Sequence, residues 1–181
     1  MHINPYGSDK ASLAVGLVNA DPAISPPEMG ELLESYNTRQ PVVDAAQTAD
    51  LLAWAAKLRV AFEADDLDVR ISTVNQLLDE AAIRPTIARH EGEMTPHLHY
   101  SLDTDDVVKR VKARTATGLA HVICASGGGR LGCCDRAGCT VVFIDTSRNG
   151  RRRFCSTQCA NRVYVADHRA RAGLTRGGSG G

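Results

Sequence analysis

"GCCDRAGCTVVFIDTSRNGRRRFCSTQCANR" (residues 132–162) holds five of the six cysteines in this 181-residue chain. Four residues separate Cys134 from Cys139, three separate Cys155 from Cys159, and 15 residues lie between the two pairs. Two closely spaced pairs joined by a loop of this length are typical of a structural zinc site. A site closed by four thiolates has no open position for water or substrate, so we expect the metal to be structural.

Other interpretations of these cysteines fit the pattern less well. In a reducing cytosol, clustered cysteines favour metal binding over disulfides, and the spacing suits zinc better than an iron–sulfur cluster. The neighbouring Cys133 would widen the first gap to five residues, so we prefer Cys134 as the ligand. Cys124 stands apart at the end of an apolar helical segment, where we expect it to be a small core residue.

The residues between and after the pairs predict a small finger. TVVFID (140–145) is rich in strand-forming residues, Asn149-Gly150 favours a tight turn, and RRRFC (151–155) is the expected partner strand. The segment after Cys155 reads as a helix, with Ser156 as a candidate N-cap. We therefore expect a treble-clef or ribbon-like finger, in which a β-hairpin precedes a helix.

The formal net charge of zero hides a strong division along the chain. Residues 1–129 carry 11 Lys and Arg against 18 Asp and Glu, a net charge of −7. Residues 130–181 carry 10 Arg and no Lys against 3 Asp, a net charge of +7. This asymmetry favours a basic module with an anionic partner. The alternatives are that the two halves attract each other, or that the arginines are solvated or neutralise the thiolates.

The basic residues predict a nucleic-acid surface on the finger. Guanidinium groups bind phosphates in a bidentate manner, and Asn or Arg can contact base edges. In the final helix, Val163, Ala166 and Ala170 form an apolar stripe that we expect to pack on the hairpin. Our candidates for contact with DNA are Arg148, Arg151, Arg152, Arg153, Asn161, Arg162, Tyr164, His168, Arg169 and Arg171.

The first two thirds of the chain read mainly as helix. Helices are predicted over 13–19, after Pro26-Pro27, after Asp44 as a cap, over 69–83, and over 103–124. A small hairpin is predicted where TIARH and HLHYSL flank EGEMTP, between 86 and 102. The expected fold is a mainly α N-terminal domain with a small β-hairpin (an α+β domain), followed by the finger.

The segment CDRAGCTVVFIDTSRNGRRRFCSTQCANRVYVADHRAR resembles the CGNR zinc finger, which occurs at the C-terminus of bacterial proteins with an ABATE domain. The family motif at the last ligand is Cys-Gly-Asn-Arg, and here Ala160 replaces the glycine. More weakly, LAVGLVNA, the alanine-rich helices and HLHY resemble the ABATE domain. The resemblance implies an ABATE-like domain at 1–125 and a CGNR-like finger at 131–172. The glycines at the change of charge sign predict a linker at 126–130, and the Gly-rich composition predicts a disordered tail at 173–181.

The resemblance also implies a function: a bacterial, stress-induced transcription regulator whose finger holds one structural Zn²⁺ and binds DNA. The N-terminal domain would then sense a small-molecule effector, form a homodimer, or both. His97 and His99 alternate on a strand and so point to one face, with Tyr100 nearby, which makes them candidates for a ligand pocket or a second metal site. The alternative for these residues is that they form a polar outer face of the sheet. The alternative is a zinc-stabilised adaptor that binds a protein or RNA without specific DNA recognition.

Sequence motifs argue against two other classes of protein. The chain has no G-x-S-x-G, no H-E-x-x-H and no phosphate-binding glycine loop, so we do not expect an enzyme. It has no signal peptide pattern and no run of about 20 apolar residues, so we expect a cytoplasmic protein without a membrane partner.

Overall fold

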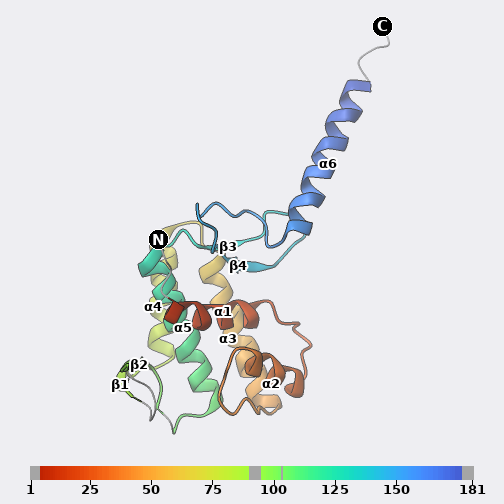
Figure 1. Cartoon of the computed structure of the whole chain (residues 1–181). Coiled ribbons are helices and arrows are strands. Elements are labelled where there is room, and N and C mark those ends of the chain that lie inside the picture. Colours follow the sequence, from red (N-terminus) through yellow and green to blue (C-terminus); the bar gives the residue numbers. More distant parts are fainter. Residues whose placement is uncertain (1–4, 90–94, 103, 177–181) are drawn as a thin grey trace.

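The computed structural model describes residues 5–89, 95–102 and 104–176, and helices dominate it (Figure 1). Two antiparallel two-stranded sheets accompany them, so the predicted mainly helical fold with a small hairpin is confirmed. The elements in chain order are α1 Pro5–Val18, α2 Pro26–Ser35, α3 Ala45–Glu63, α4 Leu67–Glu80, β1 Thr86–Ala88, β2 His97–His99, α5 Val107–Ser126, β3 Leu131–Cys133, β4 Val142–Ile144 and α6 Thr157–Arg176.

Side-chain caps set the starts of the helices in the body. The predicted cap Asp44 accepts a hydrogen bond from the Gln47 backbone N–H at 2.8 Å at the start of α3. Helix α5 begins later than predicted, because Asp106 caps it by accepting from the Lys109 N–H. Gly127 ends α5 in the left-handed region at φ 64°, a conformation that glycine adopts without steric cost.

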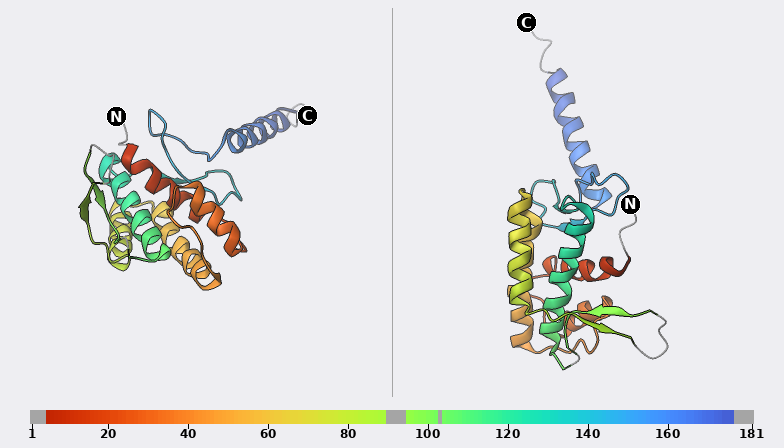
Figure 2. Two further views of the ribbon diagram at one scale, coloured as in Figure 1. Left: turned by 60° about the horizontal axis from the view of Figure 1, so that its bottom comes forward. Right: turned by 90° about the vertical axis from the view of Figure 1, so that its left-hand side faces the viewer.

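One core joins α1, α3, α4 and α5. Helices α3, α4 and α5 lie side by side, and α1 crosses α5 at a steep angle (Figures 1 and 2). Trp54 of α3 is 1% exposed and donates through Nε1 to Thr115 Oγ1 of α5 at 2.9 Å. The largest fully buried apolar side chains come from several helices: Leu13, Leu17, Met29, Leu33, Leu51, Trp54, Leu58, Val111 and Leu119.

The predicted hairpin of the N-terminal part is formed by β1 and β2. Thr86 pairs with His99, Ile87 with Leu98 and Ala88 with His97. Residues 90–94 of the connection lie outside the described part of the chain. The hairpin stands out from one side of the helices (Figure 2).

The hairpin of the C-terminal part differs from the prediction. Strand β4 pairs with β3, whereas residues 151–155 form no strand. The other edge of β4 is occupied by Asn19, whose amide group both donates to Val142 O and accepts from Val142 N at 2.9 Å. A returning strand therefore has no free edge there, and the predicted Asn149-Gly150 turn leads instead into an irregular loop.

The β3–β4 hairpin packs directly on the helical body. Leu131 and Val142 belong to the same core as the helices. Arg59 of α3 strengthens this contact by donating to Val18 O at 2.7 Å and Thr140 O at 2.8 Å. Helix α6, in contrast, projects away from the body (Figure 1).

Helix α6 continues to Arg176 and so overlaps part of the predicted tail, while residues 177–181 lie outside the described part. Among the described residues, no helix combines the length and apolar character needed to cross a membrane.

Candidate metal centre

Two local structures carry the four predicted zinc ligands. Cys134 and Cys139 lie at the two ends of the short connection between β3 and β4, and the Cys134 N–H donates to Val141 O at 3.0 Å. Cys155 precedes α6, and Cys159 lies in its first turn. Ser156 caps this turn as predicted, accepting a hydrogen bond from the Cys159 N–H at 3.2 Å. A hairpin tip and a helix start thus face each other.

The four sulfur atoms form a compact group. All four Sγ atoms lie within 4.8 Å of one another. The distances from Cys139 to Cys155, from Cys155 to Cys159 and from Cys159 to Cys139 are 3.8, 3.5 and 3.9 Å. A tetrahedral zinc ion with Zn–S bonds of about 2.3 Å requires sulfurs about 3.8 Å apart. The cysteines are therefore positioned to bind one metal ion, consistent with a single structural zinc.

Positive groups and N–H donors surround the sulfurs. Arg136 Nε donates to Cys159 Sγ at 3.2 Å, and this bond, together with that of Ser156, lowers the pKa of Cys159 to about 6. A backbone hydrogen bond from Val141 lowers the pKa of Cys139. The Cys155 N–H lies 3.4 Å from Cys134 Sγ. These effects favour the thiolate form of Cys139 and Cys159, the form that binds zinc, whereas burial raises the pKa of Cys155 to about 12.

Two cysteines lie outside this group. Cys133 is half-buried against the core near Glu63 and Arg59, and burial raises the pKa of its thiol. The preference for Cys134 over Cys133 is therefore confirmed. The expectation of a core position for Cys124 is wrong, because this residue is exposed near the end of α5.

Asp145, which is not among the residues predicted from the sequence, organises the loop after β4. This carboxylate is 3% exposed and accepts from the Ser147 N–H and the Arg152 N–H, both at 2.8 Å. Burial raises its pKa, but these hydrogen bonds and the charge of Arg130 outweigh burial and lower it overall. No partner strand holds residues 147–152 in place, and the two backbone hydrogen bonds to Asp145 position them instead. An Asp that follows a strand and precedes Ser-x-Asn-Gly is a turn signal that could have indicated this role.

The arginines of the finger fall into two groups. Arg152 donates to Phe154 O and Cys155 O and lies over the Phe143 ring, so its guanidinium helps to hold the finger together. Arg153 donates to Asp135 at 2.7 Å and lies over Phe154. The second group is exposed and has no polar partner among the described residues: Arg148, Arg151, Arg162 and Arg169.

Helix α6 touches the rest of the finger only near its start. Val163 is half-buried against the thiol group, and the Tyr164 ring meets Phe154 edge-on at 6.0 Å. The predicted packing of Ala166 on the hairpin is wrong, since Ala166 is exposed, and α6 projects away from the body (Figure 1). Asn161, Tyr164 and His168 are exposed; the side chains of Ala170 and Arg171 lie outside the described ones.

The geometry of two cysteine pairs around one metal position agrees with a comparison of the sequence with known families. Residues 130–172 match the CGNR zinc finger. The match covers β3, β4, the loop anchored by Asp145 and most of α6, and does not reach the helical body. The ABATE resemblance of that body stays a prediction. The chain matches no curated protein.

The three candidate pocket residues of the N-terminal part, His97, His99 and Tyr100, do not line one common cavity. His97 and His99 face each other across 3.0 Å between their Nε2 atoms. Tyr100 turns elsewhere: its hydroxyl lies 3.2 Å from His121 Nε2, and Lys10 lies over its ring. A cavity of about 600 Å³ is lined by Tyr100, but neither histidine reaches it.

Proposed function

We propose that this chain is a cytoplasmic DNA-binding transcription regulator, in which the CGNR finger contacts DNA and the helical body senses a ligand or mediates assembly. The observation that carries this proposal is the surface of α6. Arg162 and Arg169 lie seven residues apart, so they share one exposed side of the helix, next to the face that carries Cys159. Asn161, Val165 and His168 form a neighbouring exposed stripe on the side opposite Val163.

The shape of α6 suits a groove in duplex DNA. Its 20 residues extend about 30 Å, and most of its length stands clear of the body. The major groove is about 12 Å wide and admits one α-helix. Arginines on the outer face would bind phosphates, and Asn161 offers an amide of the kind that contacts adenine.

The division of charge along the chain favours an orientation in which the finger faces the DNA and the body faces away from it. The basic residues gather in the finger, whereas the preceding 129 residues carry a net charge of −7. Phosphates would attract the finger and repel the body. The zinc would have no catalytic role, because four thiolates fill its coordination sphere. We therefore infer that the protein acts by binding and is not an enzyme.

Paired substitutions on α6 test this proposal. Fluorescent duplex DNA is titrated with the zinc-loaded wild-type protein and with the double variant Arg162→Gln, Arg169→Gln at several salt concentrations. If both arginines bind phosphates, the slope of log K against log salt falls by about two and affinity drops at low salt. Substitution is preferable to removal of residues after 129, because Leu131 and Val142 are part of the body's core.

Arg39→Gln with Arg89→Gln is the matched control, because it removes two exposed charges from the body. This control should retain the wild-type slope. Arg152 and Arg153 are unsuitable for the test, because their side chains hold the finger together. Zinc-loaded wild-type protein that binds no duplex at any salt concentration would contradict DNA binding and direct attention to a protein or RNA partner.

A further inference from the structure

The cavity of about 600 Å³ lies at the end of the helical body opposite the finger, where α3 and α5 begin and α4 ends. Its size is within the usual range for a small-molecule site. Apolar side chains form much of its wall, and the polar ones come from three helices and from residues after β2. The apolar lining residues are Ala46, Ala81, Ala82, Leu102, Val108 and Ala113.

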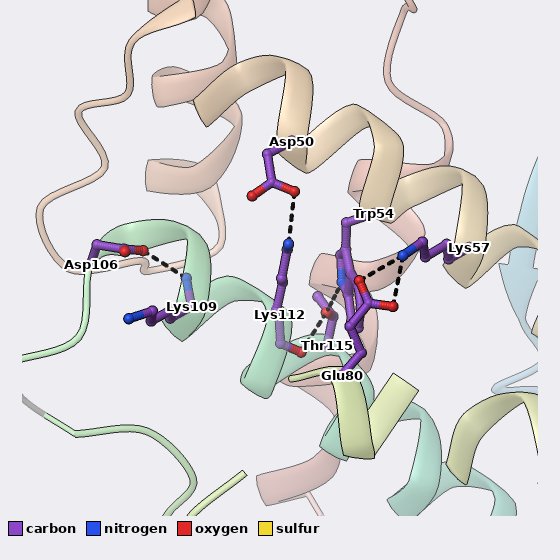
Figure 3. A network of polar contacts seen from close by, with 8 residues as sticks. All are labelled: Asp50, Trp54, Lys57, Glu80, Asp106, Lys109, Lys112 and Thr115. Atoms are coloured by element: carbon purple, nitrogen blue, oxygen red, sulfur yellow. Dashed lines mark hydrogen bonds and ion pairs between the residues drawn. The ribbon is translucent and has the colours of Figure 1, made fainter. Parts of the chain in front are cut away.

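The floor of the cavity is a fixed network of charges (Figure 3). Lys112 is 16% exposed in its side chain, donates to Asp50 at 2.7 Å, and lies over the Trp54 ring at 5.5 Å. Glu80 accepts from Lys57 at 2.6 Å. Because each of these carboxylates already has a cationic partner, neither is left to bind a cation from outside.

The remaining acids of the cavity are also engaged. Asp105 accepts from the Leu102 N–H at 2.7 Å, and Asp106 accepts from the Lys109 N–H at 2.9 Å as the cap of α5. In contrast, the side-chain cations of Arg84 and Lys109 line the cavity without a polar partner in the described part of the chain. These two cations and the apolar wall, together with Gln47 and Ser101, are therefore available to recognise a ligand.

We propose that this cavity binds a small organic molecule with one carboxylate and an apolar body. Arg84 offers the planar fork that matches a carboxylate, and Lys109 adds a second positive charge. Lys112 and Lys57 neutralise Asp50 and Glu80, which leaves Arg84 and Lys109 against Asp105 and Asp106, so the cavity has no excess of positive charge to hold a doubly charged phosphate. The apolar wall accommodates the rest of the molecule.

Helix α3 connects the cavity to the finger, so a ligand in the cavity can influence the finger through this helix. Helix α3 contributes Asp50 to the cavity floor near its start, and Arg59 nearer its end donates to Thr140 O beside Cys139. The proposal that the cavity binds a ligand does not depend on DNA binding. A regulatory role for that ligand does rest on the proposed function. The test below therefore contains no DNA.

Trp54, the only tryptophan of the chain, reports on the cavity floor through its contact with Lys112. The zinc-loaded full chain is titrated with benzoate, phenylacetate and hexanoate, each paired with its neutral amide, and with benzylamine and inorganic phosphate. Trp54 fluorescence and thermal stability are followed. We expect saturable binding of at least one carboxylate, at least tenfold tighter than its amide, the amine and phosphate.

Variants locate the site. Arg84→Gln and Lys109→Gln should each weaken carboxylate binding by about tenfold, whereas Arg89→Gln, an exposed arginine outside the cavity, should not. Ala46→Phe should block binding by filling space without altering charge. The proposal is overturned if no carboxylate binds, if amides or the amine bind equally well, or if binding survives both charge removal and Ala46→Phe.

Discussion

The guanidinium of Arg136 acts directly on a zinc ligand, through its hydrogen bond to Cys159 Sγ at 3.2 Å. This contact is the largest of several hydrogen bonds, including those of Ser156 and Cys155, that together lower the pKa of Cys159 from its usual value of 9.0 to about 6. A thiol must lose its proton before it can bind zinc. At neutral pH, Cys159 is therefore mainly thiolate before the metal arrives, and proton release from this site does not oppose zinc binding.

Replacing Arg136 with Gln should weaken zinc binding in a pH-dependent way. The pKa of Cys159 rises toward 9.0, so zinc must displace a proton at pH 7 but a much smaller fraction of one at pH 9. We expect about a tenfold loss of zinc affinity at pH 7 and a smaller loss at pH 9. Competition with a chromophoric zinc chelator at both pH values measures this.

The control for this substitution is Arg148→Gln, which removes an exposed arginine that donates no hydrogen bond to the sulfurs. It should leave zinc affinity at both pH values close to that of the wild type. An equal loss at pH 7 and pH 9 for Arg136→Gln would show that Arg136 acts on the fold of the finger and not on the thiolate.

Single residues also mark where sequence reasoning worked and where it failed. Cysteine spacing predicted the four grouped sulfurs, and Ser156 was recognised as a cap, because both signals depend on neighbours in the chain. Spacing and composition do not separate the arginines, yet Arg152 donates to backbone carbonyls while Arg162 is exposed and has no polar partner among the described residues. Only the folded loop decides which guanidinium groups find acceptors.

At the scale of elements, the contact between α1 and α5 depends on Gly118. A Cβ atom at this position would lie 2.5 Å from Ala11 N and 2.6 Å from Lys10 C. These are backbone atoms of another helix and cannot move aside separately. A glycine inside a helix normally weakens it by about 1 kcal/mol relative to alanine, so the close approach of α1 explains its presence.

Gly118→Ala should therefore destabilise the protein despite the better helix propensity of alanine. We expect a loss of about 2 kcal/mol in the free energy of unfolding, because overpacking outweighs the gain in propensity. Urea denaturation followed by Trp54 fluorescence measures it. Gly129→Ala is the control, since nothing lies within 4 Å of its added Cβ, and it should change stability little. Unchanged stability in Gly118→Ala would show that α1 can shift on α5.

At the scale of the whole molecule, the finger has two differently anchored parts. The β3–β4 hairpin shares a core with the helices and is tied to them by Asn19 and Arg59. The start of α6 packs instead on Phe154 and the thiol group, apart from that core. We infer that zinc holds α6, while burial in the body holds the hairpin.

Zinc removal should therefore unfold one part of the chain. On addition of a chelator to the full chain, helical circular dichroism should fall by the contribution of α6, because α6 has little packing of its own. Trp54 fluorescence should stay constant, because its contacts with Thr115 and Lys112 lie in the body. Re-added zinc should restore the signal.

Cys134→Ser should reproduce the effect of the chelator, and Cys133→Ser, which leaves the four grouped sulfurs intact, should bind zinc normally. Stoichiometric zinc in Cys134→Ser would contradict the ligand assignment. A change in Trp54 fluorescence on chelation would show that the body also depends on the metal.

The sequence by itself determined the features that depend on local order: the helices, the small hairpin, the two cysteine pairs and the concentration of arginine after residue 129. These follow from periodicity, caps and spacing, which act over a few residues. The tertiary structure decided that β4 pairs with β3 and Asn19, that Asp145 anchors the loop, and that Arg84 and Lys109 line one cavity. Each of these contacts either joins residues that are far apart in the chain or involves one of several residues that the sequence does not distinguish. Their partners are fixed only when burial of the shared core brings distant backbone groups and charges within hydrogen-bonding distance.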